Sequence, residues 1–204
     1  MFSLPRIYAI LDFDRLPRGM TAIDFAEELL TAGITLLQYR NKSSNARLML
    51  DGGRALRHAI GDRAHLIMND RADLCLAAAF DGVHVGQDDL SPQAARSVIG
   101  DKLILGVSTH NPEQVRAADL ATADYIAIGP VFPTGSKMNP DPVIGLEGVG
   151  LARSLTGKPL VAIGGITRQN CRSVIEAGAD SVAVISDLLI EPGKSAEAFL
   201  RVLR

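Results

Sequence analysis

Five short clusters of polar residues in this sequence carry side chains that bind phosphates and cations. Each cluster follows an apolar run typical of a buried strand, so the clusters can meet where the strands end. Arginine, lysine, paired aspartates and small hydroxyls together suit a magnesium-bound substrate with several phosphate groups. The clusters are Gln38-Tyr39-Arg40-Asn41-Lys42, Asn69-Asp70-Arg71, Gly86-Gln87-Asp88-Asp89, Gly106-Val107-Ser108-Thr109 and Gly129-Pro130-Val131-Phe132-Pro133-Thr134-Gly135-Ser136-Lys137.

Asp70 and Asp89 are the strongest candidates for metal ligands. Each lies at or just past the end of a predicted strand, on neighbouring strands. Two carboxylates, completed by substrate phosphate oxygens and water, are a usual way to hold Mg²⁺. Aspartate is also a good helix N-cap, which is the alternative for either residue alone. The pair favours a metal site, with Asp88 expected to face solvent.

Arg40 and Lys42 are the first candidates for binding phosphate. They are two positions apart, so in an extended chain they point to the same side. Arginine offers a planar fork and lysine a point charge to phosphate oxygens, although surface solubility accounts for most such residues. Lys137 is a further candidate for binding phosphate, because it follows the hydroxyl residues Thr134 and Ser136. The spacing of these residues is not that of a P-loop. The Pro- and Asn-containing segment 138–144 is a candidate lid.

Ser108 and His110 do not form a nucleophile–base pair by sequence, since no orienting acid or nucleophile elbow accompanies them. Ser108 is better interpreted as a hydrogen-bonding group for a polar ring or a phosphate. Asn69 can offer a donor and an acceptor to a heterocycle. His84 falls within a predicted strand and is expected to be a satisfied interior histidine.

Eight strands must position these groups. The apolar runs alternate with helical segments, and eight complete units without a surplus segment favour a (β/α)₈ TIM barrel over an open, doubly wound sheet. Gly165, Ile185 and Ser186 lie at or just past the ends of the last two strands, where such barrels often bind phosphate. The strands are predicted at 7–13, 35–39, 66–69, 82–86, 103–107, 125–131, 160–164 and 181–185.

Helix signals agree with this order. Thr21 is a plausible N-cap for a helix over 22–32, and a helix over 168–177 is expected to end at Gly178. Ser91-Pro92 and Asn111-Pro112 each open a further helix. Gly52-Gly53 lies inside another helix, where each glycine costs about 1 kcal/mol relative to alanine. The sequence gives no reason for that pair.

Composition limits the classes of partner. The 204 residues fit one catalytic domain over 1–204, and the formal net charge of −2 with scattered Lys and Arg argues against nucleic acid. No apolar run approaches the ~20 residues of a membrane span, and no signal peptide is visible. Cys75 and Cys171 are expected to be buried thiols in a reducing compartment. We therefore expect a soluble cytoplasmic protein.

The sequence resembles the thiamine phosphate synthase family over nearly the whole chain, from Tyr8 to about Leu188, and the resemblance rests on six motifs in order. Each is weak alone, and six in this order are specific. The motifs are Leu37 to Lys42, Met68 to Arg71, Asp81 to Leu90, Gly106 to His110, Gly129 to Lys137 and Ala162 to Ile166.

This resemblance implies a Mg²⁺-dependent transferase of thiamine biosynthesis. It would join hydroxymethylpyrimidine diphosphate to hydroxyethylthiazole phosphate, releasing pyrophosphate and forming thiamine phosphate without a protein nucleophile. Arg40, Lys42, Lys137 and Ser108 would be the catalytic side chains. By resemblance the pyrimidine diphosphate is held by Gln38, Tyr39, Arg40, Asn41, Lys42, Asn69, Ser108 and Lys137, the magnesium by Asp70 and Asp89, and the thiazole phosphate by Thr134, Gly135, Ser136, Gly165, Ile185 and Ser186.

One departure and three alternatives accompany the resemblance. The family commonly has Thr where this chain has Ser136, which keeps the hydroxyl and loses a methyl group. The alternatives are a thiazole tautomerase, a non-catalytic sensor of thiamine precursors, and a sugar-phosphate isomerase or epimerase. The magnesium and diphosphate residues argue against the first two, and the third would need acid–base residues at strand ends. The expected partners are two phosphorylated small molecules, with a homo-oligomer left open.

Overall fold

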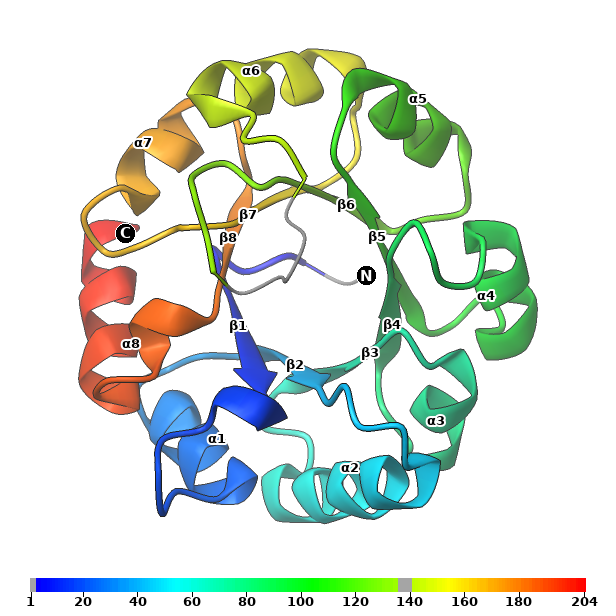
Figure 1. Cartoon of the computed structure of the whole chain (residues 1–204), viewed down its shortest axis with the longest axis vertical. Coiled ribbons are helices and arrows are strands. Elements are labelled where there is room, and N and C mark those ends of the chain that lie inside the picture. Colours follow the sequence, from blue (N-terminus) through cyan, green and yellow to red (C-terminus); the bar gives the residue numbers. More distant parts are fainter. Residues whose placement is uncertain (1–2, 136–140) are drawn as a thin grey trace.

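Eight parallel strands pair in sequence order in the computed structural model, which describes residues 3–135 and 141–204. The last strand pairs with the first, with Ile7 opposite Val182, so the barrel is closed and the open-sheet alternative is wrong. The helices form a ring around it (Figure 1). The strands are β1 Ile7–Asp12, β2 Leu36–Arg40, β3 His65–Asn69, β4 Gly82–Val85, β5 Ile104–Thr109, β6 Tyr125–Ile128, β7 Leu160–Ile163 and β8 Ser181–Val184.

The α-helices cover the outer face of the barrel. Two short 3₁₀ helices also occur, one after β1 and one after β8. The predicted (β/α)₈ barrel is thereby confirmed, with strand ends shifted by up to three residues. The helices are α1 Ala22–Thr31, α2 Ala46–Ile60, α3 Ala72–Ala77, α4 Pro92–Ile99, α5 Pro112–Leu120, α6 Gly145–Leu155, α7 Cys171–Glu176 and α8 Pro192–Val202, and the 3₁₀ helices are η1 Phe13–Arg15 and η2 Ser186–Leu188.

Each strand is buried on both faces because its side chains alternate between two cores. On β1, Ala9 and Leu11 join the large core between strands and helices, whereas Tyr8 and Ile10 belong to a second core inside the barrel. The interior core consists of Tyr8, Ile10, Leu36, Ile67, Ile104, Tyr125, Ala127, Val161 and Ala183. This alternation decides which strand residues can reach a site at the barrel mouth.

The helix starts follow the predicted caps, with one exception. Thr21 forms a capping box with Asp24, and Ser91 and Asn111 cap α4 and α5, each with proline as the first helical residue. The helix predicted from 168 begins only at Cys171, so that boundary was wrong. The backbone N–H of Arg168 instead donates to Asp187, in the loop after the next strand.

The glycine pair in α2 has a structural reason. A Cβ at Gly52 would lie 2.6 Å from the hydroxyl oxygen of Tyr39, and a Cβ at Gly53 would lie 3.4 Å from the Met68 methyl carbon. The two glycines therefore let α2 lie close against β2 and β3. This close packing offsets the helix propensity that glycine loses.

At the amino-terminal end of the barrel, one arrangement of an arginine and an aspartate occurs three times. The arginine comes from an even-numbered helix, and the aspartate directly precedes an even-numbered strand and accepts a backbone N–H from the strand before it. Each set thus ties a helix to two neighbouring strands. The sets are Arg57, Asp81 and Leu66; Arg96, Asp124 and Leu105; and Arg153, Asp180 and Leu160.

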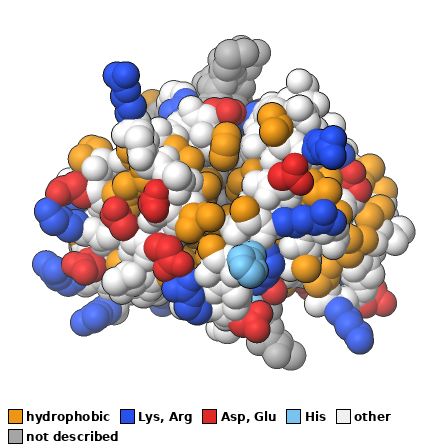
Figure 2. All heavy atoms as spheres, turned by 90° about the horizontal axis from the view of Figure 1, so that it is seen from below, with side chains coloured by type: hydrophobic (Ala, Val, Ile, Leu, Met, Phe, Trp, Pro, Cys, Tyr) orange, Lys and Arg blue, Asp and Glu red, His pale blue; other side chains and the backbone are white. Residues whose placement is uncertain are grey.

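The surface and the cysteines agree with the composition. Figure 2 shows acidic and basic side chains interspersed over the face that it draws, with no patch of one sign. In the described parts of the chain, no helix is long and apolar enough to cross a membrane. Cys75 and Cys171 are free and buried, as expected.

Candidate active site

A cavity of about 690 Å³ opens where the strands end and is lined by residues from all eight strands and the loops after them. Its size is typical of a site for small organic molecules. Because parallel strands end at the same rim, residues far apart in the sequence meet there. The predicted site residues that line it are Gln38, Arg40, Lys42, Asn69, Asp70, Asp89, Ser108, Thr134, Gly165, Ile185 and Ser186.

The remaining predicted residues are placed differently. Tyr39 alternates with its inward neighbours and is buried on the outer face of the barrel, where Asn41 donates a 3.0 Å hydrogen bond to its hydroxyl. The side chains of Tyr39 and Asn41 thus contact each other and do not line the cavity, and Gly135 does not line it either. Ser136, Lys137 and the start of the candidate lid lie outside the described residues.

Arg40 is held by a residue that the sequence analysis missed. Asp12 ends β1 opposite Arg40 in the strand register, and its fully buried carboxylate accepts a 2.7 Å hydrogen bond from Arg40 Nη1. Because a buried carboxylate needs a charged partner, this pair fixes the direction of the guanidinium at the cavity wall. An acid at the end of the first strand was the available signal, since strand ends form the rim.

Lys42, Asp70 and Asp89 form a charged group at the rim. Lys42 Nζ lies 2.5 Å from an oxygen of Asp70, and Asp89 accepts a 2.8 Å hydrogen bond from the backbone N–H of Gly86. Desolvation raises the pKa of Asp89 although the residue keeps an exposed edge, and the neighbouring carboxyl group of Asp70 raises it further. A cation beside the two carboxylates would favour the charged form of Asp89.

Neither aspartate caps a helix. Helix α3 follows Arg71 without a side-chain cap, and Ser91 caps α4. Asp70 also has a backbone φ of 63°, in the left-handed region that non-glycine residues rarely adopt. The capping alternative is therefore wrong for both residues, and the strained backbone at Asp70 is typical of a functional position.

The donor set fits magnesium better than a metal held by protein alone. Among the described residues, no group of three or more His, Cys, Asp or Glu side chains is arranged to hold a metal ion. Two adjacent carboxylates at an open rim leave positions for phosphate oxygens and water, which Mg²⁺ usually retains as ligands. Asp70 and Asp89 are thus compatible with magnesium brought together with a phosphorylated substrate.

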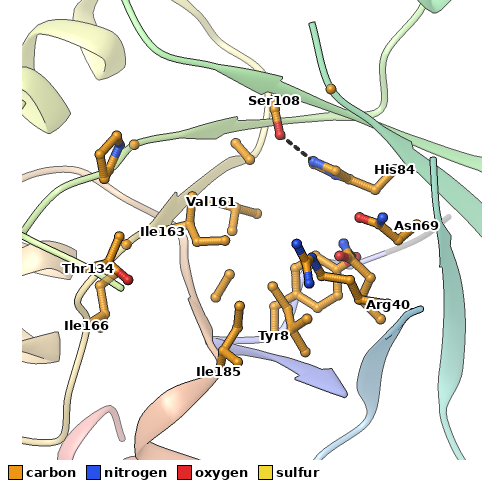
Figure 3. Close-up of a pocket in the computed structure, with 18 of the residues that line it drawn as sticks. Tyr8, Arg40, Asn69, His84, Ser108, Thr134, Val161, Ile163, Ile166 and Ile185 are labelled. Atoms are coloured by element: carbon orange, nitrogen blue, oxygen red, sulfur yellow. Dashed lines mark hydrogen bonds between the residues drawn. The ribbon is translucent and has the colours of Figure 1, made fainter. Parts of the chain in front are cut away.

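A chain of hydrogen bonds crosses the floor of the cavity from β2 to β5. Gln38 Nε2 donates to the Tyr8 hydroxyl at 2.8 Å, and the hydroxyls of Tyr8 and Tyr125 are 3.0 Å apart. His84 then bridges Tyr125 and Ser108, with 2.9 Å from Nδ1 to the Tyr125 hydroxyl and 2.8 Å from Nε2 to Ser108 Oγ. Figure 3 shows the contact between His84 and Ser108.

His84 is therefore an interior histidine with both ring nitrogens hydrogen-bonded, as expected. One of its partners is Ser108, which was predicted to bind substrate. Burial lowers the pKa of His84 to about 4, and it raises the pKa of Tyr8 and of Tyr125 above their usual value. The side chains of this hydrogen-bond chain are accordingly neutral near pH 7. The ring nitrogen away from Ser108 meets a tyrosine and not a carboxylate, so the pair lacks the acid that orients a catalytic triad.

The lowered pKa of His84 predicts a loss of stability in mild acid. The unfolded chain binds a proton near pH 6.5 and the folded chain only near pH 4, so the free energy of unfolding should fall by up to about 3 kcal/mol as the pH falls through this window. Denaturant titrations at several pH values should show a shallower fall in His84→Gln. The same change at exposed His58 should leave the wild-type slope, and an unchanged slope in His84→Gln would contradict the assignment.

The opposite wall of the cavity is mainly apolar, although Asp141, Thr167 and Asp187 from the loops after β6, β7 and β8 also line the cavity. In Figure 3, Val161, Ile163, Ile166 and Ile185 lie with Thr134 across the cavity from Arg40, Asn69 and His84. On the polar side, the amide nitrogen of Asn69 is buried and has no hydrogen-bond partner among the described residues. The cavity thus has one half suited to a polar, charged molecule and one half suited to an apolar ring.

Two glycines after β7 shape the rim of the apolar half. Gly164 and Gly165 have φ angles of 100° and 65°, and a Cβ at Gly165 would lie 2.6 Å from the carbonyl oxygen of Pro133. The loops after β6 and β7 are therefore packed too closely for a side chain. A turn follows the glycines, and the bidentate pair between Arg168 and Asp187 joins that turn to η2.

Comparisons with known proteins agree with this architecture. A family model described as "Thiamine monophosphate synthase" matches residues 7–188. A thiamine-phosphate synthase of Koribacter versatilis is 59% identical over 204 residues, covering 98% of this chain and 97% of that protein, and one of Moorella thermoacetica is 41% identical over 176 residues, covering 86% and 84%. The solved thiamine phosphate pyrophosphorylase from Pyrococcus furiosus superposes with a TM-score of 0.86 at 33% identity, covering 97% of this chain and 95% of that one.

Proposed function

Because this chain belongs to the thiamine monophosphate synthase family, we propose that its cavity holds the two phosphorylated precursors of thiamine side by side. The protein is a transferase of thiamine biosynthesis that forms thiamine phosphate. The division of the cavity into a polar and an apolar half supports the proposal, since the aminopyrimidine ring and its diphosphate are polar, whereas the thiazole ring is mainly apolar. This division is the observation that carries it.

The pyrimidine diphosphate would bind in the polar half. Arg40, fixed by Asp12, and Lys42 would contact its diphosphate, and the unpartnered amide of Asn69 would donate to the substrate. Ser108 and Gln38 would contact the pyrimidine ring from the two ends of the hydrogen-bond chain. An unpaired buried donor costs stability in the free protein, so a substrate that satisfies it gains affinity.

Asp70 and Asp89 would hold Mg²⁺ between themselves and the diphosphate. When bound, the ion supplies positive charge to the diphosphate oxygens, which lowers the barrier to departure of pyrophosphate. In the free protein Lys42 neutralises Asp70, so we expect Lys42 to move toward the diphosphate when the site is loaded.

The reaction needs charge and position more than acid–base chemistry. As the bond from the pyrimidine methylene carbon to the diphosphate breaks, Arg40 and Lys42 would face the negative charge that develops. Lys137 would add to them by the family pattern. The thiazole nitrogen then forms the new bond to the same carbon, and pyrophosphate leaves with the electron pair. The neutral floor would offer the carbon no charged nucleophile, and the apolar wall would limit the access of water.

The thiazole phosphate would bind over the apolar half. Ile163 and Ile185 would contact its ring, while its phosphate would lie at the rim near Gly165, Ser186 and Thr134. The loops after β7 and β8, with the short helix η2, are where barrels of this fold often place a phosphate. The contact between Arg168 and Asp187 holds these two loops together.

The function is tested by incubating the purified protein with both precursors, with and without Mg²⁺. Thiamine phosphate and pyrophosphate should appear in equal amounts, and only with Mg²⁺ present. Conversion of the thiazole phosphate alone would favour the tautomerase, whereas binding of the precursors without product would favour the sensor. Either result would contradict the synthase.

A further inference from the structure

The hydrogen bonds across the cavity floor have a single direction. Gln38 Nε2 donates to the Tyr8 oxygen, and among the described residues the only other partner of the Tyr8 hydroxyl is Tyr125. The buried Tyr8 proton therefore has an acceptor only when Tyr8 donates to Tyr125. Tyr125 in turn donates to Nδ1 of His84. A neutral imidazole has one proton, which must then lie on Nε2 and be donated to Ser108. The proton of Ser108 is left to point into the cavity.

Gly106 leaves space for this chain of hydrogen bonds because it has no side chain. A Cβ at this position would lie 2.3 Å from the Tyr125 hydroxyl oxygen and 2.5 Å from His84 Nδ1, so any other residue would separate the two. The rings of His84 and Tyr125 are stacked with their centroids 5.5 Å apart, and Tyr8 meets Tyr125 edge-on. Tyr8 and Tyr125 are at most 1% exposed. Tyr8 and His84 line the cavity, whereas Tyr125 does not, so Tyr125 would act on a substrate only through its neighbours.

We propose that Tyr125 is a positioning residue for the transferred ring: it fixes the tautomer of His84 and thereby makes Ser108 a hydrogen-bond donor, while Tyr8 holds Gln38 with its amide oxygen free to accept. The two ends of the chain then offer one donor and one acceptor. A ring that carries an amino group beside nitrogen acceptors is complementary to this pair. The inference rests on the proposed function, because it concerns how the pyrimidine substrate is recognised.

The opposite direction would give a different site. Ser108 would then donate to His84, and its oxygen would offer only lone pairs to the cavity. A pyrimidine nitrogen facing those lone pairs would be repelled, so the direction set by Tyr125 affects affinity for this substrate and not for the thiazole phosphate. A residue that only supports the fold would not distinguish the two substrates.

The test compares Tyr125→Phe with the wild type, which must first form thiamine phosphate from both precursors. Loss of one hydrogen bond to the ring should lower kcat/KM for the pyrimidine diphosphate about tenfold, with KM for the thiazole phosphate unchanged. Because Tyr125 acts through Ser108, Tyr125→Phe combined with Ser108→Ala should be no worse than Ser108→Ala alone. Additive losses in the double variant would overturn the inference.

A matched control separates this effect from lost stability. Thr156 is buried, does not line the cavity, and donates a hydrogen bond from its hydroxyl to Asp119. Thr156→Val should therefore lower stability without changing either KM. Should Tyr125→Phe fail to fold, nitrogen-15 NMR of the wild type decides the matter. The His84 ring should carry its proton on Nε2, and a proton on Nδ1 would overturn the inference. An inactive wild type would instead overturn the proposed function, and the inference with it.

Discussion

Asp70→Asn should lower kcat by at least about a hundredfold, because it removes one of the two charges proposed to hold magnesium at the departing diphosphate. Asparagine keeps the size of the side chain and tolerates the left-handed backbone at this position better than alanine does, so the fold should persist. Steady-state rates over a range of Mg²⁺ concentrations should show that the variant needs more metal for its residual activity.

Asp88→Asn is the matched control, since it removes the same charge from the neighbouring loop. Asp88 is exposed where it lines the same cavity and is not proposed as a metal ligand, so the rate and the Mg²⁺ dependence of this variant should stay close to those of the wild type. Full activity with normal Mg²⁺ dependence in Asp70→Asn would show that Asp70 is not a ligand. A large loss in both variants would point to the total charge of the rim and not to a defined metal site.

Arg40→Gln should reduce both activity and stability, for two separable reasons. The loss of the guanidinium removes a charge that faces the diphosphate, and kcat should fall about 10²–10³-fold. The same change leaves the buried carboxylate of Asp12 without its nearest partner, which should cost about 3 kcal/mol of unfolding free energy.

The double variant Arg40→Gln with Asp12→Asn distinguishes the two effects. Neutralising Asp12 should restore most of the stability, measured by denaturant titration, while activity stays lost. Arg47→Lys, on the exposed start of α2, should change neither quantity. If the double variant regained activity along with stability, Arg40 would be a structural residue and not part of the diphosphate site.

The alternation of strands and helices was predictable because buried parallel strands and capped helices leave local signals. Thr21, Ser91 and Asn111 act within one turn of their own position, and the structure confirms all three. The start of α7 was predicted too early, since a contact with Asp187 in another loop competes with the helix there.

The position of Asp70 and Arg40 in the cavity lining was predictable, because both follow strand ends, while their roles in binding stay predictions. The site was less predictable where the role depends on a partner across the barrel. Asp12 matters through Arg40, and Tyr125 matters through His84, so neither pairing is visible in the order of the residues. Strand periodicity could have indicated that Tyr39 points away from its inward neighbours, because side chains on a strand alternate.

The three arginine–aspartate sets have a consequence for the opposite rim. The carboxyl ends of the strands contain locally frustrated features: the unpartnered amide of Asn69, the strained backbone of Asp70 and the mutual repulsion of Asp70 and Asp89. Such features lower the free energy of unfolding, and the three arginine–aspartate sets at the other rim raise it. The barrel can therefore stay folded with an energetically unfavourable rim at its active-site end. We expect bound ligands to remove part of this unfavourable energy.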